Sequence, residues 1–204
     1  MTAAPQRDTM RSDRTWTSGR WLTVLLLCSG VATAQERPDP AALMTAQRAA
    51  MATFAFMDGA WRGPATTLRP NGEKHAIIQT ERIGPMLDGT VKLIEGRGYE
   101  SDGTTSFNAL AILAYDVATQ SYRMRSHAMG TTGDFVVQRT AEGFAWEIPA
   151  GPMTIRYNAV VKDGVWVETG DRVAPGREPV RFFEMRLERV GDSDWPAAGA
   201  IAPK

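Results

Sequence analysis

Cysteine is almost absent from this chain of 204 residues, which contains only Cys28. A single cysteine cannot form an intramolecular disulfide, so the fold must draw its stability from a hydrophobic core. Histidine is equally scarce, with His75 and His127 the two in the sequence. Neither sign of charge is in excess, because 23 basic residues face 23 acidic ones. A balanced chain lacks the basic footprint of nucleic-acid-binding proteins, so no nucleic-acid partner is expected.

Sequence motifs of enzymes are also lacking. The chain has no Gly-x-Ser-x-Gly, no His-Glu-x-x-His and no phosphate-binding glycine-rich loop. The nearest approach to a hydrolytic set is Ser126, His127 and Asp134. Ser126 and His127 are neighbours in an extended segment and point to opposite faces, so they cannot form a nucleophile–base pair. No spacing fixes a metal site around either histidine. We therefore expect a protein that is not an enzyme and that has no metal and no cofactor.

Residues 1–34 have the layout of a secretory signal peptide. Three arginines between positions 11 and 20 precede the apolar run WLTVLLLCSGVATA, which ends in the cleavage-site pattern Ala32-Thr33-Ala34. The apolar run is shorter than the roughly 20 residues that a membrane-spanning helix needs. The sequence thus predicts export to the bacterial periplasm or beyond, with no stable membrane span after cleavage.

Cys28 raises the alternative of a lipid anchor. Lipoprotein signals place a small residue immediately before the modified cysteine, whereas Leu27 stands there in this chain. We therefore do not expect lipoprotein anchoring. Translation can start at Met1 or at Met10, and the sequence leaves this open.

Residues 35–53 are expected to form a short helix or a linker. Asp39 can cap a helix, Pro40 suits its first position, and an alanine-rich stretch continues to Ala52.

Turn signals recur at short intervals from residue 55 onward. Asn-Gly and Asp-Gly pairs at 71, 88, 102 and 163 accept the positive φ angles of tight hairpins. Between the turns, apolar and polar residues alternate, as Phe183, Met185 and Leu187 do on one face of their segment. The pattern predicts about ten strands, at 57–68, 74–83, 90–100, 107–116, 121–129, 134–140, 143–148, 153–162, 165–172 and 180–190.

This series of short strands indicates an all-β fold. An antiparallel up-and-down β-barrel is favoured because an open meander of this length would leave two exposed edges. We expect the barrel over residues 54–190 and a flexible tail over 191–204, in which Trp195 is the one residue suited to packing on the barrel.

Three segments carry a family resemblance: FMDGAWRG at 56–63, IGPMLDGTVKLIEGRG at 83–98 and LAYDVATQSYRMRSHAMGTTGDF at 113–135. With them the chain resembles the calycin superfamily of lipocalin-like barrels and, within it, the bacterial domain family DUF1579. The haem-binding nitrobindin-like barrels share a Gly-x-Trp-x-Gly signature, matched here by Gly59, Trp61 and Gly63. Those barrels hold iron on a histidine, and neither His75 nor His127 can be assigned to that position.

The resemblance also implies structural roles. The tryptophan of the first strand closes one end of such barrels, and an arginine of the last strand can lie over its ring; Arg186 and Arg189 are the candidates for this cation–π contact with Trp61. Gly59 is expected to permit a sharp bend into the strand, and Gly63 to mark a bulge or a close approach of chains.

The barrel interior is the expected binding site. Trp146, Tyr157, Trp166 and Phe183 would supply an apolar wall, and Arg125 and His127 would lie at the lumen if their face of the strand turned inward. The alternative for Arg125 and His127 is a solvated outer face. We expect a small apolar or amphipathic ligand in the lumen. The alternatives are a filled barrel that serves as an interaction module and a haem-binding nitrobindin-like protein; a homodimer stays open.

Overall fold

The computed structural model describes residues 38–195. The predicted signal peptide, with Cys28 and the expected cleavage site, lies outside the described residues, as does the tail after Trp195. No helix of the described part is long and apolar enough to cross a membrane.

Within the described residues, one α-helix, α1 (Pro40–Ala52), precedes the strands, as predicted. Its first turn is capped by Asp39, whose carboxylate accepts a hydrogen bond from the Ala41 amide at 3.0 Å. Pro40 occupies the first helical position, where a backbone N–H would have no acceptor within the helix, so the lack of an N–H on proline costs no hydrogen bond. A short 3₁₀ turn, η1 (Ala55–Met57), then leads into the first strand.

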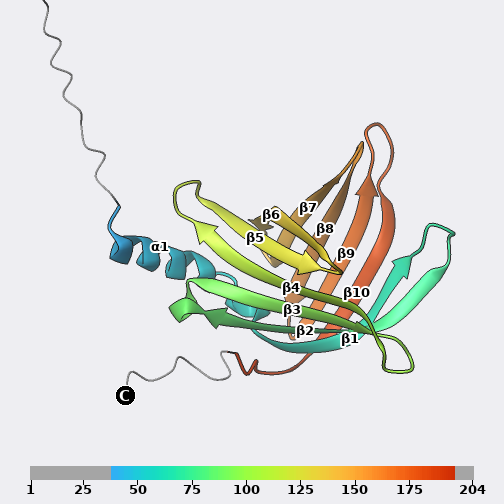
Figure 1. Ribbon diagram of the computed structural model, residues 1–204, viewed down its shortest axis with the longest axis horizontal. Coiled ribbons are helices and arrows are strands. Elements are labelled where there is room, and N and C mark those ends of the chain that lie inside the picture. The colour runs from blue at the N-terminus through green and yellow to red at the C-terminus, as the bar shows by residue number, and fades with distance from the viewer. Residues whose placement is uncertain (1–37, 196–204) are drawn as a thin grey trace, which may run out of the picture. The chain divides into compact units, whose positions relative to one another are not determined.

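Ten antiparallel strands form a closed barrel, which confirms the predicted all-β fold (Figure 1). Each strand pairs with the next in sequence, and β1 closes the barrel by pairing with β10. A second 3₁₀ turn, η2 (Leu87–Gly89), separates β2 from β3. The strands are β1 (Gly59–Leu68), β2 (Lys74–Met86), β3 (Val91–Tyr99), β4 (Thr105–Asp116), β5 (Ser121–Ala128), β6 (Thr131–Arg139), β7 (Gly143–Ala150), β8 (Met153–Lys162), β9 (Val165–Val173) and β10 (Val180–Gly191).

Buried side chains from α1, η1 and the barrel wall form one hydrophobic core. Figure 1 shows α1 next to one end of the barrel. Met51 of α1 and Phe54 and Met57 around η1 are almost completely buried there, together with Ile83 and Leu187 from the barrel wall. The segment before β1 therefore seals this end of the barrel, which we call the closed end. Its aromatic and aliphatic side chains are withdrawn from water, which is the main stabilising term for a domain without disulfides.

Trp61 belongs to this seal, as predicted. Its indole N–H donates to the Met57 carbonyl oxygen at 2.9 Å, and its ring packs edge-on against Trp166 with 5.9 Å between ring centroids. The expectation that Arg186 or Arg189 covers this ring was wrong. Arg186 alternates with buried Met185 and Leu187 and so faces outward, while Arg189 donates to the Asp58 carbonyl oxygen and pairs with Asp192.

The two glycines of the motif have the expected backbone roles. Gly59 has a φ of 137°, which a residue with a side chain rarely adopts, and a Cβ there would lie 2.8 Å from the Gly191 carbonyl oxygen. A Cβ on Gly63 would lie 2.1 Å from the Arg186 carbonyl oxygen. Gly63 therefore marks a close approach of β1 to β10.

Two details complete the barrel wall. Strands β6 and β7 pair only through residues 137–139 and 144–146, so they part toward the end opposite α1, which we call the open end. Beyond β10, Trp195 packs on the outer face of β2, where the Arg82 guanidinium lies 4.1 Å from its ring centroid.

Candidate functional site: an acidic, aromatic cavity in the lumen

The lumen of the barrel contains a cavity of about 950 Å³. The cavity begins beside Met57 and Trp166 near the closed end and reaches Arg69, His75 and Pro149 at the open end. Small side chains on β4 and β5, among them Ala109 and Ser126, keep its centre wide. The volume falls within the range of small-molecule sites, roughly 300–1,000 Å³.

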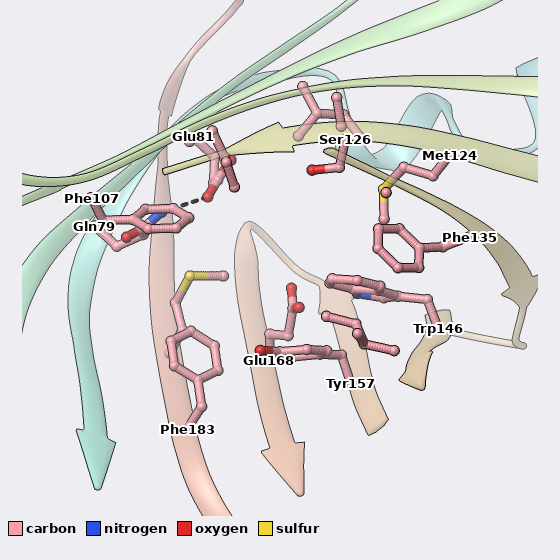
Figure 2. Close-up of a pocket in the computed structure, with 18 of the residues that line it drawn as sticks. Gln79, Glu81, Phe107, Met124, Ser126, Phe135, Trp146, Tyr157, Glu168 and Phe183 are labelled. Atoms are coloured by element: carbon pink, nitrogen blue, oxygen red, sulfur yellow. Dashed lines mark hydrogen bonds between the residues drawn. The ribbon is translucent and has the colours of Figure 1, made fainter. Parts of the chain in front are cut away.

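Aromatic side chains form one wall of this cavity. The rings of Trp146 and Tyr157 stack with 4.5 Å between centroids and 12° between planes, and Phe135 packs on the other side of Trp146 at 5.1 Å. Phe183 meets the edge of Tyr157 at 6.0 Å. Figure 2 shows Phe135, Trp146 and Tyr157 one after another along one side, with Phe107 and Phe183 across from them. Alternation along β6, β7 and β8 turns these side chains inward.

Polar side chains stand deeper in the same cavity. Gln79 and Glu81 lie on β2, on the face that also carries Ile77 and Ile83, and Glu168 lies on β9. Gln79 and Glu168 retain 4% and 8% of their surface. The Gln79 amide donates to Glu81 Oε1 at 2.8 Å, and the Trp166 indole donates to Glu168 Oε2 at 3.2 Å. Both carboxyl groups point into the space between the aromatic side chains (Figure 2).

Burial changes the acidity of both carboxyl groups. Withdrawal from water raises the pKa of Glu81 to about 8, against a smaller lowering by the Gln79 hydrogen bond, and the charges of Glu168 and Glu95 raise it further. Withdrawal from water also raises the pKa of Glu168 to about 7, although the indoles of Trp146 and Trp166 favour its ionised form. The cavity thus holds a carboxyl pair that changes charge close to neutral pH.

The mouth of the cavity is polar. His75 lies there with its Nε2 at 3.0 Å from Glu100 Oε2. Arg69 and Thr131 also line this end and are exposed. A molecule that entered from solvent would therefore pass a hydrated rim before it met the aromatic wall.

Four of the six predicted lumen residues do line the cavity: Trp146, Tyr157, Trp166 and Phe183. The lumen position predicted for Arg125 and His127 was wrong. Strand β5 turns Met124, Ser126 and Ala128 inward, so Arg125 and His127 are exposed outside, where they contact Asp134 and Thr132. Met124 is apolar and only 8% exposed, and its burial determines which face of β5 turns inward.

Sequence reasoning missed Gln79, Glu81 and Glu168. A usable signal was present, because Glu81 shares its face of the strand with Ile77 and Ile83, and Glu168 shares its face with Trp166. A carboxyl on an otherwise apolar face is a candidate for burial and for function.

Nothing among residues 38–195 brings three or more His, Cys, Asp or Glu side chains together in a geometry for a metal ion. His75 lines the cavity mouth and His127 is outside the barrel, so the two histidines do not share a site.

Comparisons with known proteins give the fold and no more. No family model matches the chain, and no curated protein matches it, so the resemblance to DUF1579 stays a prediction. Among solved structures, the chain is similar to Rv2717c from M. tuberculosis, with a TM-score of 0.52 and 10% sequence identity. The match covers 69% of this chain and 96% of that one. This likeness bears out a lipocalin-like β-barrel.

Proposed function

We propose that this protein is a non-enzymatic binding protein that holds a small apolar or amphipathic molecule in its barrel lumen. The single observation that carries the proposal is the cavity of about 950 Å³ with its aromatic wall. An aromatic wall around an open lumen gains free energy when an apolar molecule displaces water from it. The polar groups at the depth of the cavity would fix the orientation of that molecule.

The open lumen favours this proposal over a filled interaction module. A filled barrel would carry large side chains at the inward positions of β4 and β5, whereas this barrel has Ala109, Ala111 and Ser126 there. Most of the large aromatic side chains stand instead on β6, β7, β8 and β10, around the space that the small ones leave.

Titration with the neutral lipophilic dye N-phenylnaphthylamine tests the proposal. We expect a saturable rise of dye fluorescence at one dye per barrel. Ala109→Phe places a ring in the lumen and should weaken dye binding at least about ten-fold, which is about 1.4 kcal/mol. Leu110→Phe on the outer face of the same strand is the matched control, because Leu110 is 41% exposed.

A dye response that both phenylalanine variants leave unchanged would place the dye on the surface and contradict the proposal. Circular dichroism of both variants, with thermal unfolding, distinguishes a blocked lumen from a barrel that has failed to fold.

We also infer that the protein acts after export, on the strength of the basic, apolar and A-x-A segments of residues 1–34. An exported carrier without cysteine in its mature part would depend on the packed closed end for stability.

A further inference from the structure

We infer that the ligand of this cavity is an organic cation, an amine in its ammonium form, whose charged head faces Glu81, Glu168 and Gln79 in the depth of the lumen. This inference rests on the proposed binding function and names the chemical class of the ligand. It comes from the carboxyl pair that the cavity encloses and from what surrounds that pair.

The carboxyl pair has no counter-charge from the described part of the chain. The ion pairs among residues 38–195 include neither Glu81 nor Glu168. Arg82 and Arg97, the basic residues on the strands nearest Glu81, are both bound to Glu95 on the outer face. Lys92 is buried but paired with Asp58 at the closed end. An ionised carboxylate enclosed in protein without a cation is costly, so the site favours a ligand that supplies one.

The neighbours of the pair are hydrogen-bonding groups without charge. Glu168 accepts from the indole of Trp166, and Glu81 accepts from the amide of Gln79. The side chain of Gln79, with 4% of its surface exposed, is held against Glu81 by this hydrogen bond. The carboxyl groups of Glu81 on β2 and Glu168 on β9 thus face one cavity, and an ammonium group has up to three N–H donors to offer their oxygens.

The aromatic wall suits the same ligand. The faces of Trp146 and Tyr157 carry the negative π density that attracts a cation, and the rings also provide apolar surface for the body of an amphipathic amine. Figure 2 shows Glu168 beside Trp146 and Tyr157, so a charged head at the carboxyl groups would leave the apolar body against the rings of the wall. An anionic ligand in that orientation would make ionisation of the two carboxyl groups still less favourable, because like charges repel.

Three decyl compounds that differ only in the head group test this inference. Decylammonium, decanol and decanoate are titrated calorimetrically into the full mature chain at about pH 8, below their micelle concentrations. We expect decylammonium to bind at least ten times more tightly than decanol, and decanoate to bind most weakly. The double variant Glu81→Gln, Glu168→Gln should remove the preference for decylammonium while decanol affinity stays within about two-fold. Glu188→Gln, on the exposed face of β10, is the matched control and should keep the preference.

The outcomes separate the two proposals. Equal affinity of the wild-type protein for decylammonium and decanol overturns the inference and leaves the lumen-binding function standing. Binding of none of the three compounds contradicts the function itself. If the double variant does not fold, the wild-type comparison of the three head groups decides alone. A preference that survives in a folded double variant also overturns the inference, because the cation would then be held elsewhere.

Discussion

Glu81 on β2 and Glu168 on β9 face the same cavity, and the charge of Glu168 raises the pKa of Glu81. The two strands are not neighbours, since β1 and β10 lie between them in the barrel. Closure of the barrel therefore creates the pair. Neither carboxyl group has a cationic side chain as a partner among the described residues. Uncharged donors hold them in place: the Gln79 amide for Glu81 and the Trp166 indole for Glu168.

The carboxyl pair should make stability depend on pH. Both pKa values are raised above the ordinary value of 4.5, so the folded state favours the protonated acids. This stabilisation is complete below about pH 4.5 and is lost as the pH rises through about 7 and 8, because the unfolded chain releases these protons earlier. Relative to the Glu81→Gln, Glu168→Gln variant, the ligand-free wild type should lose a few kcal/mol of unfolding free energy between about pH 5 and pH 9.

Chemical denaturation of both proteins across that pH range measures the difference. Subtracting one curve from the other removes the contribution of titratable and charged groups that both proteins share near the carboxyl pair. These groups are Glu95, His75, Glu100, Tyr157 and Arg172. Burial raises the pKa of Tyr157 to about 12. A difference that is constant with pH would show that the carboxyl groups titrate normally.

The aromatic wall should dominate binding of apolar molecules. Trp146→Ala removes the ring that stacks on Tyr157 and contacts Phe135, and we expect it to weaken N-phenylnaphthylamine binding by about ten-fold or more. Trp195→Ala is the matched control, because Trp195 packs against Arg82 on the outer face of the barrel. Equal losses in the two variants would mean that the lumen wall is not the binding surface.

Gly63 should be intolerant of any side chain. A Cβ at this position would lie 2.1 Å from the Arg186 carbonyl oxygen, so Gly63→Ala must push β1 away from β10. We expect a loss of about 2–4 kcal/mol of unfolding free energy in thermal or chemical denaturation. Gly191→Ala, at a position where a Cβ has no atom within 4 Å, should change stability by less than about 0.5 kcal/mol. A Gly63→Ala protein as stable as Gly191→Ala would contradict the observed close approach.

Export predicts a defined mature protein. Expression of the full sequence in a Gram-negative host should yield a periplasmic chain that begins at Gln35, as determined by intact-mass measurement and N-terminal sequencing. Replacing Ala32 and Ala34 by bulky residues should cause the precursor to accumulate. Recovery of the uncleaved chain from the cytoplasm would contradict the export prediction.

Local patterns were sufficient for the elements of the fold. The Asp39 cap and Pro40 located α1, and period-two alternation between glycine turns located the ten strands within a few residues. Local patterns did not always show which face of a strand turns toward the lumen. On β5 both faces carry polar residues, and only Met124 and Tyr122 distinguish the inner from the outer face, so Arg125 and His127 were assigned to the wrong side.

The polar residues deep in the site could be identified only from the tertiary structure. No local pattern relates Glu81 to Glu168, because their meeting requires closure of β1 on β10 and the register of four strands. The cation–π contact expected at Trp61 failed for a related reason. Pairing with β9 fixes which face of β10 turns inward, and that face carries Met185 and Leu187 instead of Arg186.

The most direct test of the account is the position of a bound amine in solution. Intermolecular nuclear Overhauser effects between decylammonium and the protein measure it. The account predicts contacts from the methylene next to the nitrogen to the Trp166 indole in the depth of the lumen, and from the chain methylenes to Trp146 and Phe135. Contacts confined to exposed side chains on the outer wall, such as Leu110 and Ile112, would contradict it.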